Sequence, residues 1–138
     1  ANDFIYGIGN CGKGSKIPGI RVSALSANPA VLTCLGNDIG FENIFSYQLK
    51  VQAKKNDLLI VLSGSGNSPN VISAINTANQ IGLKTFAILA FDGGKCNNIA
   101  NYPLHFKIND MQIAEDLQLI IGHLCMQWLS NNKSEFFG

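Results

Sequence analysis

The sequence predicts an α/β protein with a central parallel sheet, from three observations. Short apolar runs alternate with segments whose apolar residues recur at helical spacing. The longest run, Leu58 to Leu62, is continuous, as in a central strand buried on both faces of a parallel sheet. Only 14% of residues are charged and 46% are hydrophobic, which suits a covered sheet or an oligomer subunit. Right-handed crossovers would then give a three-layer αβα sandwich.

The N-terminal part is predicted to hold two short strands, Phe4 to Ile8 and Ile20 to Leu25. The first runs into a glycine turn over residues 7–12, where glycines permit positive φ angles. Residues 13–19 contain two further glycines and a proline, and are too short and broken for a normal crossover helix.

Two helices are predicted next. Asn28 is placed to cap a short helix from Pro29 to Leu35, which the turn Gly36-Asn37-Asp38 should end. A second helix is expected from about Phe41 to Ala53 and leads to the strand at Leu58.

The C-terminal half continues the alternation. A helix should begin with Ser68 as its cap and Pro69 in its first turn, and end at Gly82, before a strand from Thr85 to Ala90. Alternating residues predict a half-exposed edge strand from Leu104 to Ile108. The last helix, 113–129, has a stripe of apolar residues expected to be buried: Ile113, Leu117, Ile120, Ile121, Leu124 and Trp128.

Length and charge narrow the functional classes. A chain of 138 residues predicts one domain, 1–138. The net charge is +1 and Lys54-Lys55 is the only adjacent basic pair, which argues against a nucleic-acid partner. No apolar run approaches the roughly 20 residues of a membrane helix, so we expect no membrane association. The widely spaced cysteines 11, 34, 96 and 125, with no secretory leader, predict four buried thiols in a cytoplasmic protein.

The strongest local motif is the serine loop, Ser63-Gly64-Ser65-Gly66-Asn67-Ser68, between a strand and a helix. Its hydroxyls, its glycines and the positive end of the helix suit a phosphate group without the need for a lysine. An ordinary Ser/Gly-rich loop that caps a helix is the alternative. By contrast, the Gly7-x-Gly9-x-x-Gly12 pattern lacks the helix that a dinucleotide or P-loop site requires, so we expect no nucleotide cofactor.

The last helix also carries polar residues on one side. Gln112, Asp116 and His123 project at similar angles, and Glu115 lies on the neighbouring ridge. Such a face could move protons or bind a divalent metal, although a solvated helix face has the same pattern. His105, beside a lysine on the edge strand, is interpreted as a solvated histidine.

Taken together, these motifs resemble the sugar isomerase (SIS) domain family, with phosphoheptose isomerases as the closest group. The matching segments are the serine loop, residues 91–95 (Phe-Asp-Gly-Gly-Lys), the Ala-Glu-Asp-Leu run at 114–117 with the later histidine, Gly9-Asn10-x-Gly12, and residues 36–41.

The resemblance implies a flavodoxin-like fold, a homotetramer with active sites between subunits, and a cytoplasmic role in lipopolysaccharide precursor synthesis. The implied reaction is the aldose–ketose isomerisation of sedoheptulose 7-phosphate to D-glycero-D-manno-heptose 7-phosphate through an enediol. The implied phosphate ligands lie in the serine loop: Ser63, Gly64, Ser65, Gly66, Asn67 and Ser68. The implied sugar contacts are Asn10, Gly12 and Asp38. Glu115 and His123 are the implied catalytic residues and the implied ligands of a possible zinc ion.

One departure from the family is large. These enzymes follow the first glycine turn with a helix that bears a catalytic Glu and a His, and residues 13–19 stand in its place; a helix that commonly precedes the first strand is absent too. Either catalysis is lost, leaving a module that senses a phosphosugar or docks on a protein partner, or the sequence omits a segment and joins its flanks.

Overall fold

The computed structural model describes residues 1–10, 18–132 and 135. Its contacts group into two compact units, and each is described by itself. The sheet unit is Leu25–Glu115, and the terminal unit combines Ala1–Ala24 with Asp116–Gly138. Within the described residues, no helix has the length and apolarity needed to cross a membrane. The single domain expected from chain length stays a prediction.

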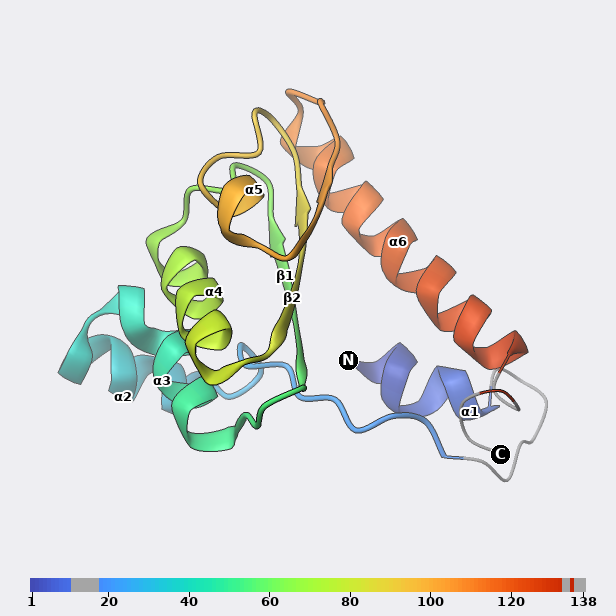
Figure 1. Cartoon of the computed structure of the whole chain (residues 1–138), viewed down its shortest axis with the longest axis horizontal. Helices are drawn as coiled ribbons and strands as arrows, with labels where there is room; N and C mark the ends of the chain where they lie inside the picture. Colours follow the sequence, from blue (N-terminus) through green and yellow to red (C-terminus); the bar gives the residue numbers. More distant parts are fainter. Residues whose placement is uncertain (11–17, 133–134, 136–138) are drawn as a thin grey trace. The chain divides into compact units, whose positions relative to one another are not determined.

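The sheet unit is built on a three-stranded parallel sheet of order β1-β2-β3 (Figure 1). The strands are β1 (Leu58–Ser63), β2 (Lys84–Leu89) and β3 (Tyr102–His105). The predicted α/β class and parallel pairing are therefore confirmed. The edge strand predicted at Leu104 to Ile108 exists, but it begins and ends earlier in the chain.

The prediction that Leu58 to Leu62 forms a central strand was wrong for the described sheet. β2 lies in the middle and β1 lies at an edge. Alternate side chains of β1 face the core, while Leu58, Ile60 and Leu62 are 58%, 43% and 55% exposed. A continuous apolar run does not reveal which of its residues face a covered side, because every position in it has the same polarity.

Helices α3 (Ile44–Gln52) and α4 (Pro69–Ile81) pack against each other on one side of the sheet (Figure 1). Their apolar residues join the inward side chains of β1 and β2 in one core: Leu49, Leu59, Val61, Ala74, Ile75, Ala78, Leu83, Ala87, Leu89 and Cys96. The short helix α5 (Cys96–Ile99) contributes the last of these. Burial of this cluster supplies the main stabilisation of the sheet unit.

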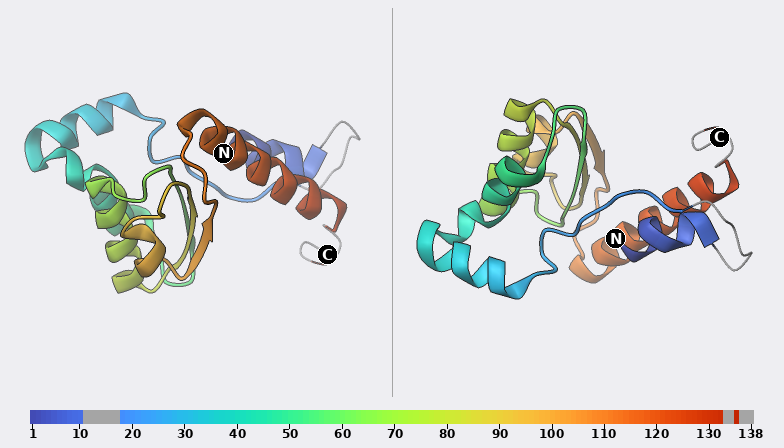
Figure 2. Two further views of the ribbon diagram at one scale, coloured as in Figure 1. Left: turned by 90° about the horizontal axis from the view of Figure 1, so that it is seen from above. Right: turned by 90° about the horizontal axis from the view of Figure 1, so that it is seen from below.

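Helix caps lie where the sequence predicts them. The Asn28 side chain accepts a hydrogen bond from the Val31 amide at 3.2 Å at the start of α2 (Pro29–Ile39). Ser68 occupies the cap position of α4, and Gly82, with φ 92°, ends that helix in the left-handed conformation. Figure 2 shows α2 further from the sheet than α4, in keeping with the absence of buried residues in α2.

Some predicted boundaries in this region need correction. α2 continues through Gly36-Asn37-Asp38, which were expected to form a turn, and the chain reverses only at Gly40, whose φ is 89°. A single glycine inside a helix costs only about 1 kcal/mol, which the flanking helical residues offset. The helix predicted at Phe41 to Ala53 is divided into a 3₁₀ turn, η2 (Phe41–Asn43), followed by α3.

The two strands predicted near the N-terminus were wrong. Asp3–Gly7 forms a short π-helix, η1, followed by α1 (Ile8–Asn10), and the Phe4 and Ile5 amides both donate to the Ala1 carbonyl at 3.0 Å. Residues 20–25 form no strand. A five-residue apolar run is ambiguous between the two structures, and a helix satisfies its backbone locally where a strand needs a paired neighbour. The glycine turn predicted over residues 7–12 was wrong where the structure describes it, because Gly7 lies in η1 and Gly9 in α1. Residues 11–17, which hold the end of that turn and most of the break after it, lie outside the described residues.

The long last helix is confirmed as α6 (Met111–Asn131), but the burial predicted for its apolar stripe was wrong. Ile113, Ile120, Leu124 and Trp128 are 48%, 49%, 55% and 55% exposed, because the described residues do not cover this side of the helix.

The cysteine prediction also needs correction. Cys96 is buried, whereas the free thiols of Cys34 and Cys125 lie on exposed helix surfaces, and Cys11 is outside the described residues.

Candidate functional site

The serine loop connects the carboxyl end of β1 to the first turn of α4 (Figure 1). The buried Ser63 hydroxyl accepts a hydrogen bond from the Gly66 amide at 3.1 Å, and the Ser65 hydroxyl accepts one from the Asn67 amide at 3.2 Å. These two hydrogen bonds curl the loop on itself, and loops with successive backbone amides are common in anion sites.

Several donors of this loop are not used by the protein. Ser68 occupies the cap position of α4, yet its side chain makes no capping hydrogen bond. Within the described part of the chain, the amides of Ser65 and Ser68 have no partner either. Both residues are half-buried beside the positive end of α4. Hydroxyls and amides at such a helix start can bind an anion.

A second loop, residues 91–95, follows β2 and packs directly on the serine loop. The Cys96 amide donates to the Gly66 carbonyl at 2.9 Å, and the Lys95 amide donates to the Asn67 side-chain oxygen at 3.1 Å. Gly66 has a φ of 65°, and a Cβ atom there would lie 2.0 Å from the Gly93 carbonyl oxygen. Position 66 therefore requires glycine for two reasons: its backbone conformation, and the lack of space for a side chain.

The side chain of Asn67 is occupied at both ends. Its oxygen accepts from the Lys95 amide, and its Nδ2 donates to the Ser65 carbonyl at 3.2 Å. Asn67 therefore joins the two loops. The sequence predicted a phosphate contact here, which these bonds do not test.

His105 is the residue that the sequence interpretation missed. It was taken for a solvated histidine, but it is half-buried at the end of β3, with Nε2 3.0 Å from the Phe91 carbonyl oxygen. The signal for this was weak, since alternation on an edge strand does not show that the loop after the neighbouring strand, β2, lies against one of its side chains.

Asp38 is exposed in the last turn of α2. Among the described residues, no hydrogen bond joins it to the serine loop. Its carboxylate accepts from Asn37 Nδ2 at 2.9 Å and from the Cys34 thiol at 3.6 Å. The hydrogen bond to Asp38, followed by the negative charge of Asp38, raises the pKa of Cys34. Cys34 consequently keeps its proton to higher pH than an ordinary surface thiol.

The remaining predicted residues are on other elements. Asn10 is the last residue of α1, and Gly12 lies outside the described residues. Glu115 is exposed near the start of α6. His123, in the terminal unit, is half-exposed, with Nε2 3.3 Å from the Asp3 carboxylate.

Zinc sites in proteins commonly have three or four protein ligands. Glu115 and His123 offer two, and the described residues contain no group of three His, Cys, Asp or Glu side chains that could hold a metal. The described residues therefore do not form a zinc centre, and no chemical step is assigned to one.

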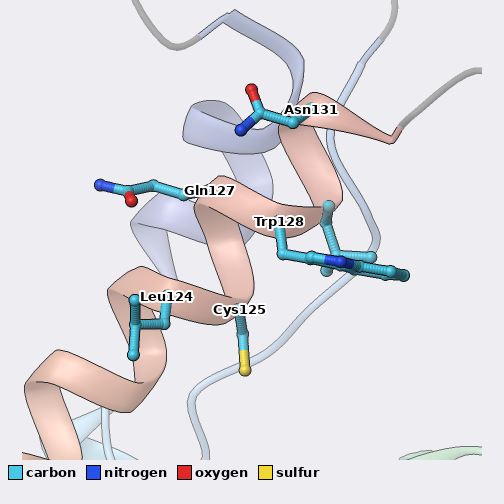
Figure 3. Close-up of a pocket in the computed structure, with 6 residues that line it drawn as sticks. Leu124, Cys125, Gln127, Trp128 and Asn131 are labelled. Carbon is cyan, nitrogen blue, oxygen red and sulfur yellow. The ribbon is translucent and has the colours of Figure 1, made fainter.

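The terminal unit has a hollow of about 650 Å³ on α6, lined by Leu124, Cys125, Gln127, Trp128, Leu129 and Asn131. Figure 3 shows these side chains on the last turns of the helix. The lining is mostly apolar and contains none of the predicted site residues. This hollow is therefore a poor candidate for a phosphate site.

Comparison with known proteins gave consistent matches. The SIS domain family matches residues 1–90. A phosphoheptose isomerase of Aliarcobacter butzleri is 37% identical over 118 residues, which cover 86% of this chain and 61% of the relative. One of Clostridium acetobutylicum is 39% identical over 115 residues, covering 83% and 57%. The chain thus spans about three fifths of the length of these relatives.

Two solved structures share the fold. A phosphoheptose isomerase from Francisella tularensis has a TM-score of 0.81 at 26% identity, covering 84% of this chain and 62% of that one. A phosphoheptose isomerase from Neisseria gonorrhoeae has a TM-score of 0.83 at 25% identity, covering 95% and 69%. The described fold is therefore similar to theirs.

Proposed function

The chain belongs to the SIS domain family, and from this we propose that it binds a sugar phosphate at the serine loop and isomerises sedoheptulose 7-phosphate to D-glycero-D-manno-heptose 7-phosphate. The observation that carries the proposal is the serine loop itself, with unused hydroxyl and amide donors at the start of α4. Relatives named phosphoheptose isomerase support the choice of substrate.

In this proposal three features of the serine loop bind the phosphate. The hydroxyls of Ser65 and Ser68 donate directly, and the free amides and the α4 dipole add positive potential. Ser63 stabilises the loop by accepting a hydrogen bond from the Gly66 amide. The two glycines permit close approach of the backbone to the phosphate. A phosphate bound in this way needs no lysine.

The chemistry would be a proton transfer between adjacent carbons of the open-chain sugar. A base removes the proton from the carbon next to the carbonyl while the carbonyl oxygen takes up a proton, which gives an enediol. The base then returns its proton to the former carbonyl carbon, and the hydroxyl on the neighbouring carbon loses its proton to become the new carbonyl. We assign the acid–base role to His123, with Glu115 assisting and with Asn10, Gly12 and Asp38 contacting the sugar. Asp3, beside His123 Nε2, would fix the orientation of the imidazole.

We further propose a homo-oligomer, as a tetramer, acting in the cytoplasm. The exposed apolar side chains of α6 support association, since such surfaces on soluble proteins usually meet a partner. The exposed free thiols of Cys34 and Cys125 support a reducing compartment.

Binding tests the first part of the proposal. The double variant Ser65→Ala, Ser68→Ala should weaken binding of sedoheptulose 7-phosphate at least about tenfold, because it removes two hydrogen bonds to a charged group. Calorimetry measures the dissociation constant. Ser26→Ala, an exposed serine before α2, is the control and should bind as wild type. Unchanged affinity in the double variant refutes the serine loop as the phosphate site.

Turnover decides between the enzyme and a second candidate, a phosphosugar-binding module without catalysis. The second candidate is favoured by residues 13–19, which contain neither Glu nor His where the resemblance to the family implies a helix with a catalytic Glu. If the chain is an isomerase, wild type interconverts the two sugars, and His123→Ala lowers kcat about a hundredfold or more while sparing binding. Tight binding by a wild type that shows no turnover would leave the binding module.

A further inference from the structure

Both peptide groups of Phe91 are held in place. Its amide donates to the Ile108 carbonyl at 2.9 Å, and its carbonyl lies 3.0 Å from His105 Nε2. A carbonyl oxygen can only accept a hydrogen bond, so Nε2 must carry the proton. Phe91 has a φ of 50°, a left-handed conformation that is unusual for any residue other than glycine. The two hydrogen bonds therefore fix a backbone that would otherwise relax.

The conformation of Phe91 determines where the following turn goes. That turn brings Gly93 against Gly66 and sets the Lys95 and Cys96 amides on the serine loop. The imidazole also lies beside the turn, since a Cβ atom on Gly93 would come within 3.4 Å of His105 Cε1. A chain of contacts thus runs from His105 through Phe91 to Gly66 and Asn67.

We propose that His105 is a positioning residue for the phosphate site: by donating to the Phe91 carbonyl it holds loop 91–95 against the serine loop, which keeps the anion-binding donors in place. The inference rests on the proposed function, because it assigns His105 a role in that same site. His105 itself does not touch the phosphate.

The role depends on one atom, which makes it testable by substitution. His105→Gln places an amide NH₂ group near the position of Nε2, whereas His105→Asn places it near Nδ1, too short to reach Phe91. His105→Leu has no donor. Only the glutamine variant should restore the bond to the Phe91 carbonyl. Glutamine and leucine have similar size, so a residue that merely fills space would not distinguish these two variants.

The first measurement is the dissociation constant of inorganic phosphate for the full chain, with thermal melting as a check of folding. We expect the leucine and asparagine variants to bind about tenfold more weakly, and the glutamine variant to stay within about threefold of wild type. Variants that all match wild type, or a glutamine variant as weak as the leucine variant at equal Tm, overturn the inference.

The second measurement does not depend on a ligand. Hydrogen exchange of the Lys95 and Cys96 amides reports how firmly loop 91–95 is held, and it should accelerate about tenfold in the leucine and asparagine variants only. Unchanged exchange overturns the inference while leaving the proposed function intact. If the wild type does not bind phosphate, both the inference and the proposed function are overturned. The phosphate-binding measurement on the wild type alone identifies this outcome.

Discussion

Gly66 shows how closely two loops can depend on a single residue. Its φ is positive, and a Cβ atom on it would lie 2.0 Å from the Gly93 carbonyl oxygen, so there is no room for a side chain. The Cys96 amide bonds to its carbonyl, so a shift at Gly66 moves both loops. The residue is thus required by the backbone before any ligand is considered.

Gly66→Ala should lower the free energy of unfolding by at least about 2 kcal/mol, since left-handed backbone and overlap with Gly93 both oppose the new methyl group. Urea denaturation measures the loss. The matched control is Gly122→Ala, inside α6, where a Cβ atom meets nothing within 4 Å. There alanine should stabilise by up to about 1 kcal/mol through helix propensity. Equal effects at the two glycines would contradict the tight contact between the loops.

At this scale the sequence predicted the serine loop but not its support. Serines and glycines between a strand and a helix carry their own chemistry, so the loop could be recognised locally. His105 acts on Phe91, which is 14 residues away, through a carbonyl that any amino acid would provide. The contact therefore could not be predicted from the residue type at position 91.

Among the helices, α2 and α4 begin with different uses of a polar cap residue. Asn28 uses its side chain to bind the Val31 amide, whereas Ser68 makes no such bond and keeps its hydroxyl for other partners. Stability and binding should therefore separate between these two positions.

Asn28→Ala should cost about 1 kcal/mol of unfolding free energy, because it removes a cap hydrogen bond. Ser68→Ala should cost less than about 0.5 kcal/mol and act mainly on phosphate affinity. Chemical denaturation of the two single variants measures this contrast. A larger stability loss at Ser68 than at Asn28 would show that the serine is a structural cap.

Helices were predictable where apolar residues recur at helical spacing over a long segment or where a cap residue is present, as for α4 and α6. The prediction failed for Phe4 to Ile8, where five apolar residues fit a helix as well as a strand. The end of α2 failed for a different reason. Gly36 looks like a helix stop, but the reversal occurs at Gly40, and either glycine could adopt the conformation.

For the molecule as a whole, α6 carries six of the large hydrophobic side chains that the described residues leave exposed. Leu124 and Trp128 are more than half exposed on its last turns. If the proposed homo-oligomer covers them, burial of this surface contributes to association.

Leu124→Glu should weaken self-association more than about tenfold, because a charge buried without a partner is costly. Light scattering coupled to size exclusion measures the mass across a concentration series. Gln112→Glu adds the same charge at an exposed polar position in the first turn of the same helix, outside the hollow that Leu124 and Trp128 line, and is the control. If both variants keep the wild-type mass, this part of α6 is not the interface.

The outward row of β1, Leu58, Ile60 and Leu62, also bears on how the protein must be handled. An apolar strand at a sheet edge is a template for pairing with further chains, and β1 has neither proline nor charge within it. Lys54, Lys55 and Asp57, just before the strand, are the only nearby gatekeepers against aggregation. With a net charge of +1, the chain has little repulsion between copies, so low concentration and a pH well below the isoelectric point should favour soluble material.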